Sequence, residues 1–224
     1  MSVLINNASQ VLTMTRGIGV LKRTSVLIEN GLIRRIGAIK ASAQHRIIDA
    51  QGCVVCPGFV DSHTHIVFAG SREDEFAMRM KGVKYGAIAR AGGGIASTVR
   101  NTAKATEDDL YELGRRRIRN IIRHGTTTVE IKSGYGLMPD AEYKMLRAIK
   151  RLQTRAPIDV IGTFLVHTVP HKMKRKDYIQ LVKKEMIPYV ARKKLALFCD
   201  IFCDDIAFTR KESEGILSTA RDYG

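Results

Sequence analysis

Residues 57–68 read Pro57-Gly58-Phe59-Val60-Asp61-Ser62-His63-Thr64-His65-Ile66-Val67-Phe68, which predicts one buried strand ending in two histidines. Side chains of a strand alternate between its two faces, so His63 and His65 point to the same side and can meet one metal ion. An isolated His-x-His is nevertheless more often a pair of polar strand residues than a metal site. The surrounding sequence has to decide between these two interpretations.

The composition is that of a globular protein. The chain has 224 residues, of which 45% are hydrophobic and 26% are charged, and this is enough to bury a substantial core. The sequence contains no apolar run of the roughly eighteen residues that a membrane span needs. Its first residues lack the basic segment and apolar core of a secretory signal peptide. We therefore expect no membrane span and a cytoplasmic location.

A formal net charge of +15 makes nucleic acid a rival partner. Basic clusters lie at residues 115–119, 172–176 and 192–194, with little aromatic interleaving and no recognisable nucleic-acid motif. The first cluster falls on the polar face of a predicted helix. A solvated surface is the preferred explanation, and a basic binding module for nucleic acid or another partner is kept as the alternative.

Two cysteine pairs invite a zinc or redox interpretation. Cys53 and Cys56 have two residues between them, whereas Cys199 and Cys203 have three. Both pairs lie in runs rich in Val, Ile and Phe that predict buried strands, where free cysteine behaves as a small hydrophobic residue. A cysteine metal site is therefore disfavoured.

The segment 1–56 predicts a small N-terminal β layer. Asn30-Gly31 is a typical two-residue hairpin turn between two candidate strands. Another turn is expected at Ala50-Gln51-Gly52. The candidate strands are residues 2–6, 10–14, 25–28, 32–36, 46–49 and 53–56.

Residues 57–224 predict a second domain of about four strand-then-helix units. Thr106 and Thr209 each begin a capping-box pattern, and Pro188 is expected to shorten or kink the end of its helix. The segment 91–95 contains three glycines whose spacing matches neither the dinucleotide fingerprint nor the P-loop, so it predicts a flexible loop. Besides 57–68, the expected strands are 126–132, 158–167 and 197–204; the expected helices are 71–81, 106–124, 139–153, 175–190 and 209–224.

Serial strand-then-helix units imply parallel strands with right-handed crossovers. Four chemically informative residues, His63, His65, Tyr135 and His167, all fall at or just after the carboxyl ends of predicted strands. In an eight-stranded β/α barrel this is the face that carries the active site. The pattern therefore predicts an α/β fold with part of such a barrel.

The run from Ile48 to His65 closely resembles the entry to the barrel in the metal-dependent amidohydrolase superfamily. Four further segments, residues 68–73, 91–95, 125–137 and 163–170, resemble the imidazolonepropionase family in particular. The resemblance extends over essentially the whole chain from about residue 25. It implies the first half of a (β/α)8, TIM-type barrel and hydrolysis of a cyclic amide, 4-imidazolone-5-propanoate, to N-formimino-glutamate in histidine degradation.

The same resemblance implies roles for residues that contact the substrate, a small molecule. Arg72 would pair with the propionate carboxylate, because a guanidinium binds carboxylates in a two-pronged geometry. Tyr85 and Tyr135 would contact the substrate, and His167 would act as the catalytic residue that hydrogen-bonds or polarises the imidazolone carbonyl. Without the resemblance, Arg72 is a surface residue, Tyr85 a packing ring and His167 a satisfied core histidine.

By resemblance, His63 and His65 would be the first two ligands of one mononuclear Zn²⁺ or Fe²⁺ site. The family takes a further His and a Glu from its fifth strand and an Asp from its eighth, and neither segment occurs in these 224 residues. Catalytic zinc normally has about three or four protein ligands. We therefore expect an incomplete site, weak metal binding and no activity of this chain by itself.

Several alternatives stay open at this stage. The chain could be a non-catalytic truncated product, or it could be active only when the second half is supplied in trans. Another cyclic amidohydrolase or a deaminase is disfavoured by the segment 132–136, Lys-Ser-Gly-Tyr-Gly. A homodimer like that of the family is a further alternative, although we do not expect it of half a barrel.

Overall fold

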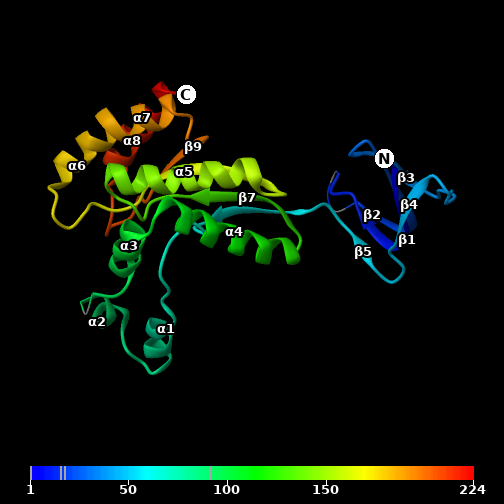
Figure 1. The fold of residues 1–224 in the computed structure, drawn as a ribbon, viewed down its shortest axis with the longest axis horizontal. Coiled ribbons are helices and arrows are strands. Elements are labelled where there is room, and N and C mark those ends of the chain that lie inside the picture. The colour runs from blue at the N-terminus through cyan, green and yellow to red at the C-terminus, as the bar shows by residue number, and fades with distance from the viewer. Residues whose placement is uncertain (1, 16, 18, 91) are drawn as a thin grey trace. The chain divides into compact units, whose positions relative to one another are not determined.

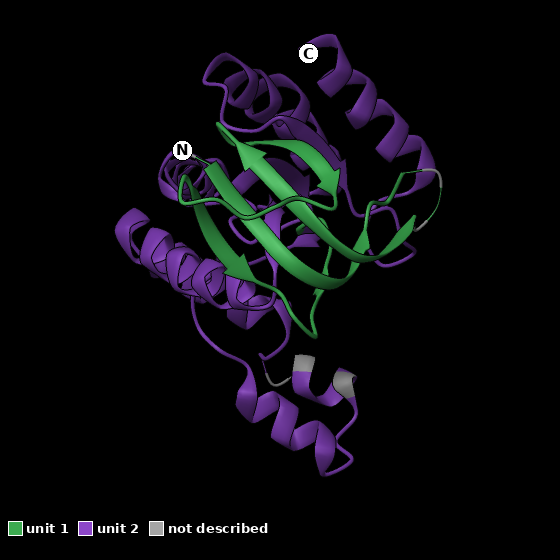
Figure 2. Ribbon diagram, turned by 90° about the vertical axis from the view of Figure 1, so that its right-hand side faces the viewer, with its two compact units in different colours: residues 1–58 green, residues 59–224 purple. Residues whose placement is uncertain are grey.

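The computed structural model describes residues 2–15, 17, 19–90 and 92–224, without the side chains of Tyr85, Ala89 and Arg90. The chain divides into two compact units, Met1–Gly58 and Phe59–Gly224, which Figure 2 shows in green and purple. Each unit has its own hydrophobic core. The units are therefore described separately.

The first unit is a five-stranded sheet built around its longest strand. β1 (Ser2–Leu12) pairs in antiparallel fashion with β2 (Val20–Glu29) and in parallel with β4 (His45–Asp49) and β5 (Val54–Val55). β3 (Leu32–Gly37) pairs with β2 through the predicted hairpin. Asn30 and Gly31 have φ values of 52° and 80°, the positive values that a two-residue hairpin turn of this type requires.

The two strands expected at 2–6 and 10–14 are one continuous strand. The register of β1 against β2 shifts between Ile5 and Ala8, and Asn7 has a φ of 58°. Such a bulge lets a strand continue past an irregular position. The gap expected between residues 6 and 10 is therefore a bulge within one strand.

The second unit is centred on a parallel four-stranded sheet. Its strands lie in the order β6 (Phe59–Thr64), β7 (Thr126–Lys132), β8 (Asp159–Val166) and β9 (Phe198–Ile201). All three pairings are parallel, which confirms the predicted half barrel. The predicted bounds of β7 agree with the structure, because its run rich in β-branched residues directly follows Gly125 and ends before the turn at Ser133-Gly134.

Three long helices cover one face of this sheet with their apolar sides. α4 (Glu107–Arg123) and α5 (Pro139–Arg155) pack beside β7 and β8, as Figure 1 shows, and α8 (Arg210–Asp222) lies near β9. The predicted capping boxes of α4 and α8 are both present. The core includes Val129, Ile131, Met145, Leu146, Ile149, Leu152, Val160 and Phe164, all nearly inaccessible to solvent. No helix in the described part of the chain is long and apolar enough to cross a membrane.

Between β6 and α4, three helices occur where one was predicted. They are α1 (Glu73–Met80), α2 (Tyr85–Arg90) and α3 (Ile95–Lys104). The sequence of α3 did not predict a helix because its buried positions are Thr98 and Thr102, which break the apolar periodicity. The Thr102 hydroxyl accepts a hydrogen bond from the Ala69 backbone N–H at 3.2 Å. Of the expected glycine loop, Ala91 lies outside the described residues and Ile95 already belongs to α3.

The histidine strand is not buried, contrary to the prediction. Phe59 and Val60 are 57% and 67% exposed, and His63 is exposed as well. An apolar run indicates a strand that is covered on both faces. Within the described residues β6 lies at the edge of the sheet and pairs only with β7. The apolar side chains of Phe59 and Val60 are therefore largely uncovered by the described residues.

The cysteines are also more exposed than expected. All four are free thiols; Cys53, Cys56 and Cys203 are exposed, and Cys199 is half-buried. The predicted strands around them are short, because β5 has two residues and β9 ends before Cys203. The burial of Cys199 raises the pKa of its thiol to about 12, so this thiol is not reactive at neutral pH.

Pro188 does not shorten its helix, contrary to one of the two expected outcomes. α6 (Arg175–Leu181) continues through a π-helical turn, Val182–Met186, into α7 (Ile187–Arg192). Pro188 lies in the first turn of α7, where the missing N–H of proline is tolerated. The wider π turn before it accommodates the proline ring, and the helical path continues to Arg192.

Candidate functional site

Four aromatic side chains gather at the carboxyl ends of β6, β7 and β8. The ring centroids of His63 and His65 are 5.5 Å apart, and those of His65 and His167 are 6.0 Å apart in a stacked arrangement. Tyr135 lies 5.4 Å from the His65 ring and 5.5 Å from the His167 ring. Three separate strand ends therefore place four of the six predicted site residues in one cluster.

His65 has the electrostatic environment of a neutral ligand. Burial lowers the pKa of His65 to about 4, with further lowering by the charges of His167, His63 and Lys132. Its Nδ1 atom is buried and has no hydrogen-bond partner among the described residues. Metal ligands must be deprotonated imidazoles, so the chemistry of His65 fits a metal ion. In the described part of the chain, no group of three or more His, Cys, Asp or Glu residues is arranged to hold one.

His167 is oriented by the backbone of the neighbouring loop. Its Nδ1 lies 3.2 Å from the carbonyl oxygen of Gly134, which can only accept a hydrogen bond. Nδ1 therefore carries the proton, and Nε2 is the atom available to a ligand. Burial lowers the pKa of His167, although the bond to Gly134 opposes this shift.

Tyr135 belongs to the loop 133–137 between β7 and α5. Burial raises the pKa of its phenol, while the positive charge of Arg72 opposes the shift. The phenol therefore remains protonated at neutral pH and can donate a hydrogen bond. Leu165 packs on this loop: a methyl group on Gly134 would lie 3.0 Å from its Cδ2.

Arg72 is held by an ion pair with Glu75, and the side chain of Tyr85 lies outside the described residues. Arg72 precedes α1, and its Nε and one terminal nitrogen each lie 2.8 Å from Glu75 Oε2. The other Glu75 oxygen accepts a hydrogen bond from the Gly94 N–H at 2.8 Å. Arg72 is thus bound to a carboxylate of its own chain. Tyr85 begins α2, and its side chain lies outside the described residues.

A polar network that we did not predict lies beside the cluster. Lys132 Nζ is 2.9 Å from both Glu130 Oε1 and Asp200 Oδ2, and the Thr163 hydroxyl donates to Glu130. Burial alone would lower the pKa of Lys132, but these two carboxylates raise it above its usual value. The period-two spacing of Glu130 and Lys132 was a signal that they share a face of β7.

Arg117 holds the segment that follows His65. It lies on α4 and donates hydrogen bonds to the carbonyl oxygens of Ile66 and Phe68, at 2.7 and 2.8 Å. Its guanidinium also lies 3.8 Å from the centroid of the Phe68 ring. We had assigned Arg117 to a solvated basic cluster, because its sequence neighbours are arginines. The structure shows that it is half-buried.

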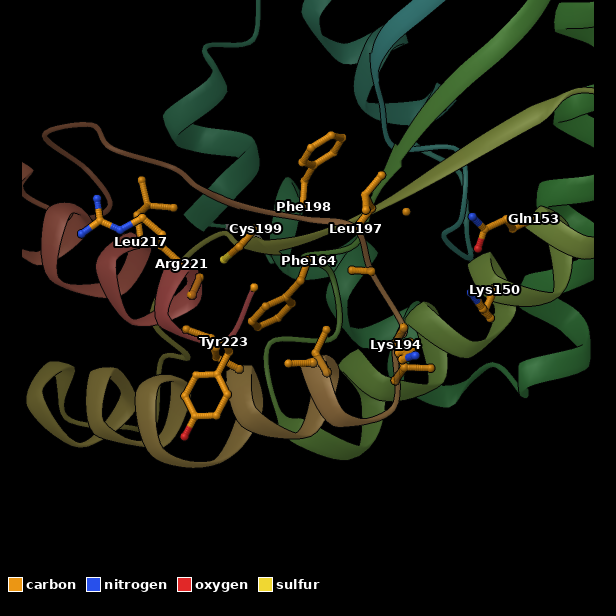
Figure 3. A pocket seen from close by; sticks show the side chains of 18 residues that line it. Lys150, Gln153, Phe164, Lys194, Leu197, Phe198, Cys199, Leu217, Arg221 and Tyr223 are labelled. Atoms are coloured by element: carbon orange, nitrogen blue, oxygen red, sulfur yellow. The ribbon is translucent and has the colours of Figure 1, made fainter.

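A cavity of about 640 Å³ lies elsewhere, on the helix-covered face of the sheet (Figure 3). It is lined by β8, β9, α5, α7 and α8, including Phe164, Phe198, Leu217 and Tyr223. None of the predicted site residues whose side chains the structure describes lines it. This cavity is therefore separate from the cluster of rings.

Comparison with known proteins gives a consistent result. A family described as the Amidohydrolase family matches residues 46–93. An imidazolonepropionase from Clostridium tetani is 42% identical over 100% of this chain and 58% of its own length. Solved structures of a triazine hydrolase and of an atrazine chlorohydrolase from Arthrobacter aurescens complexed with zinc align with TM-scores of 0.58 and 0.51. They are 17% and 16% identical, and each alignment covers 99% of this chain and 51% of the solved one.

The parallel half barrel with histidines at its strand ends and the similarity to known relatives place the chain in the amidohydrolase superfamily. Within that superfamily the chain belongs to the imidazolonepropionase family and corresponds to the N-terminal portion of its members. The chain spans about half the length of the curated relatives it matches.

Proposed function

We propose that the cluster of rings, together with Arg72 and Tyr85, forms the N-terminal half of an imidazolonepropionase active site. The complete site would hydrolyse the cyclic amide of 4-imidazolone-5-propanoate to N-formimino-glutamate in histidine degradation. The observation that carries the proposal is the cluster of His63, His65, Tyr135 and His167 at three parallel strand ends. The identity to imidazolonepropionases over the whole chain supports the same substrate.

In this proposal His63 and His65 hold one Zn²⁺ or Fe²⁺ ion, together with ligands from outside residues 1–224. A divalent metal, when bound, would act as a Lewis acid and lower the pKa of the water that it binds toward neutral pH. The low pKa of His65 supports this role, because the imidazole is then free of a competing proton. The zinc complex of a protein with the same fold supports zinc as the first ion to test.

The other residues bind and orient the substrate. Arg72 pairs with the propionate carboxylate, which requires it to exchange its bond to Glu75 for one to the substrate. Tyr85 contacts the substrate, and the protonated phenol of Tyr135 donates a hydrogen bond to it. His167, with Nδ1 held by Gly134, presents Nε2 to the imidazolone ring and polarises its carbonyl when Nε2 is protonated.

Ring-opening of imidazolone propionate tests the proposal. A polypeptide of residues 1–224 is assayed with Zn²⁺ or Fe²⁺, alone and mixed with the C-terminal portion of the Clostridium tetani relative. We expect no turnover alone, because two imidazoles are fewer than the three or four protein ligands of a typical catalytic zinc. In the mixture we expect turnover that His65→Ala abolishes. Turnover by residues 1–224 alone, or turnover that His65→Ala leaves unchanged, would contradict the proposal.

The high net charge favours one alternative, a basic module that binds nucleic acid or another partner on this scaffold. Retention on nucleic acid that falls steeply with salt would support it.

Another cyclic amidohydrolase or deaminase activity is tested by offering other cyclic amides in the same assay. A cytoplasmic location and the absence of a homodimer stay predictions.

A further inference from the structure

Glu142 has a buried carboxylate that contacts the loop 133–137. It lies in the first turn of α5 and is 1% exposed. Helical side chains tilt toward the N-terminus of their helix, so its carboxylate reaches back under the loop 133–137, which precedes α5. A charge in such a place is unfavourable unless its oxygens are hydrogen-bonded.

The loop supplies these hydrogen bonds from its backbone. Glu142 Oε1 accepts from the Gly134 N–H, and Oε2 accepts from the N–H groups of Gly136 and Leu137 at 2.9 and 2.7 Å. The Ser133 hydroxyl contacts the same carboxylate. Backbone N–H groups can only donate, so together they select the acceptor-only, ionised carboxylate. Burial is the larger influence and holds the pKa of Glu142 above its ordinary value, while these hydrogen bonds act in the opposite direction.

The loop that Glu142 holds has an unusual backbone. Gly134 has a φ of 108°, and Leu137 has a φ of 59°, a conformation that is unfavourable for a residue with a side chain. A Cβ atom on Gly136 would overlap the backbone of Ala141 and Glu142, so the loop lies directly on the first turn of α5. Such a backbone persists only when its surroundings hold it.

The same loop connects Glu142 to two proposed site residues. Tyr135 lies between Gly134 and Gly136, whose N–H groups both bind Glu142. Gly134 binds Glu142 through its N–H and His167 through its carbonyl oxygen. We propose that Glu142 is a positioning residue, whose carboxylate fixes the loop 133–137 so that Tyr135 and His167 face the substrate. The relevance to catalysis rests on the proposed roles of Tyr135 and His167.

Nuclear magnetic resonance of residues 1–224 tests this role through Glu142→Gln, which keeps the size of the side chain and removes its charge. We expect amide hydrogen exchange at Gly134, Gly136 and Leu137 to accelerate by about tenfold or more, because charge-assisted hydrogen bonds are lost. The ring signals of Tyr135 and His167 shift, and the cross-relaxation between these rings weakens. Exchange in the centre of β8 stays unchanged.

Asp140→Asn is the matched control. Asp140 lies in the same helical turn and is exposed, and we expect its amide variant to leave the loop signals as they are. Unchanged exchange and unchanged Tyr135 and His167 signals in Glu142→Gln would overturn the positioning role. Glu142→Asp, which retains the charge, is the second variant. If Glu142→Gln and Glu142→Asp both lose structure throughout β7 and β8, the positioning role is overturned in favour of a general structural role.

The unsubstituted chain gives an independent result. We expect slow exchange at Gly134, Gly136 and Leu137, and exchange as fast as in exposed loops would overturn the proposal by itself. By contrast, an absence of ring-opening in the mixture with the C-terminal portion would contradict the proposed function, even if these loop signals are as expected. The two inferences can therefore fail separately.

Discussion

The two sides of the histidine cluster are held in different ways. Tyr135 and His167 lie on the β7–β8 side, where a buried carboxylate of α5 binds the loop between β7 and α5. His63 and His65 lie on the β6 side, where the strand is exposed and has one strand neighbour in the described residues. The β7–β8 side is thus held by contacts between the loop 133–137 and α5, whereas β6 is an edge strand with exposed apolar side chains within the described residues.

The largest expected difference between the two sides is in core stability. Leu146 on α5 is fully buried behind β7 and β8, and Leu146→Ala is expected to lower the free energy of unfolding by about 2–5 kcal/mol. Val60 on β6 is 67% exposed, and Val60→Ala is expected to change it by less than about 0.5 kcal/mol. Urea unfolding measures both variants, and equal losses would contradict the comparison.

The polar network beside the cluster should give the next largest effect. Lys132→Met leaves Glu130 and Asp200 without their cation and is expected to cost roughly 2–4 kcal/mol. This expected cost is lower than that of breaking a fully buried ion pair, because the Asp200 side chain is 41% exposed. Arg210→Met is the control, because the pair of Arg210 with Glu214 is exposed and is worth about 0.5 kcal/mol or less. A cost for Lys132→Met no larger than that of the control would contradict this prediction.

On the β6 side, Arg117 is the main internal support. Arg117→Met removes two hydrogen bonds to the segment 66–68 and is expected to cost roughly 1.5–3 kcal/mol. Arg116→Met, at the exposed neighbouring position, should have almost no effect. Amide exchange after His65 should accelerate only in Arg117→Met. Equal exchange in the two variants would show that the segment does not depend on Arg117.

A smaller effect is expected from alkaline pH. The pKa of Lys132 is raised in the folded chain, so its contribution to stability is complete below the unfolded value of about 10.4. That contribution is lost as pH rises through the higher, folded pKa. The stability gap between the unsubstituted chain and Lys132→Met should therefore narrow over the pH range above about 10.4. A gap that stays constant over this range would contradict the assigned role.

Local signals predicted the fold well. The hairpin at Asn30-Gly31 and the two capping boxes depend on neighbouring residues only, and each was predicted correctly. The sheet order follows from serial β/α units, and it accounts for the meeting of His65, Tyr135 and His167. These predictions needed no knowledge of distant contacts.

The features that were missed depend on contacts that no local pattern shows. Asp200 binds Lys132 from 68 residues away in the chain. Glu142 resembles any exposed helical glutamate in sequence, and only the fold buries it under a loop. The exposure of Val60 was missed because an apolar strand predicts burial without saying which residues would cover it.

The most direct test of the metal half of the site is a Zn²⁺ titration of residues 1–224 followed through the histidine ring signals. We predict that the signals of His63 and His65 change together, that the exposed His124 and His171 do not respond at the same concentrations, and that His65→Ala removes the response. Zinc that is bound by Cys53 and Cys56 while the signals of His63 and His65 stay unchanged would contradict the account.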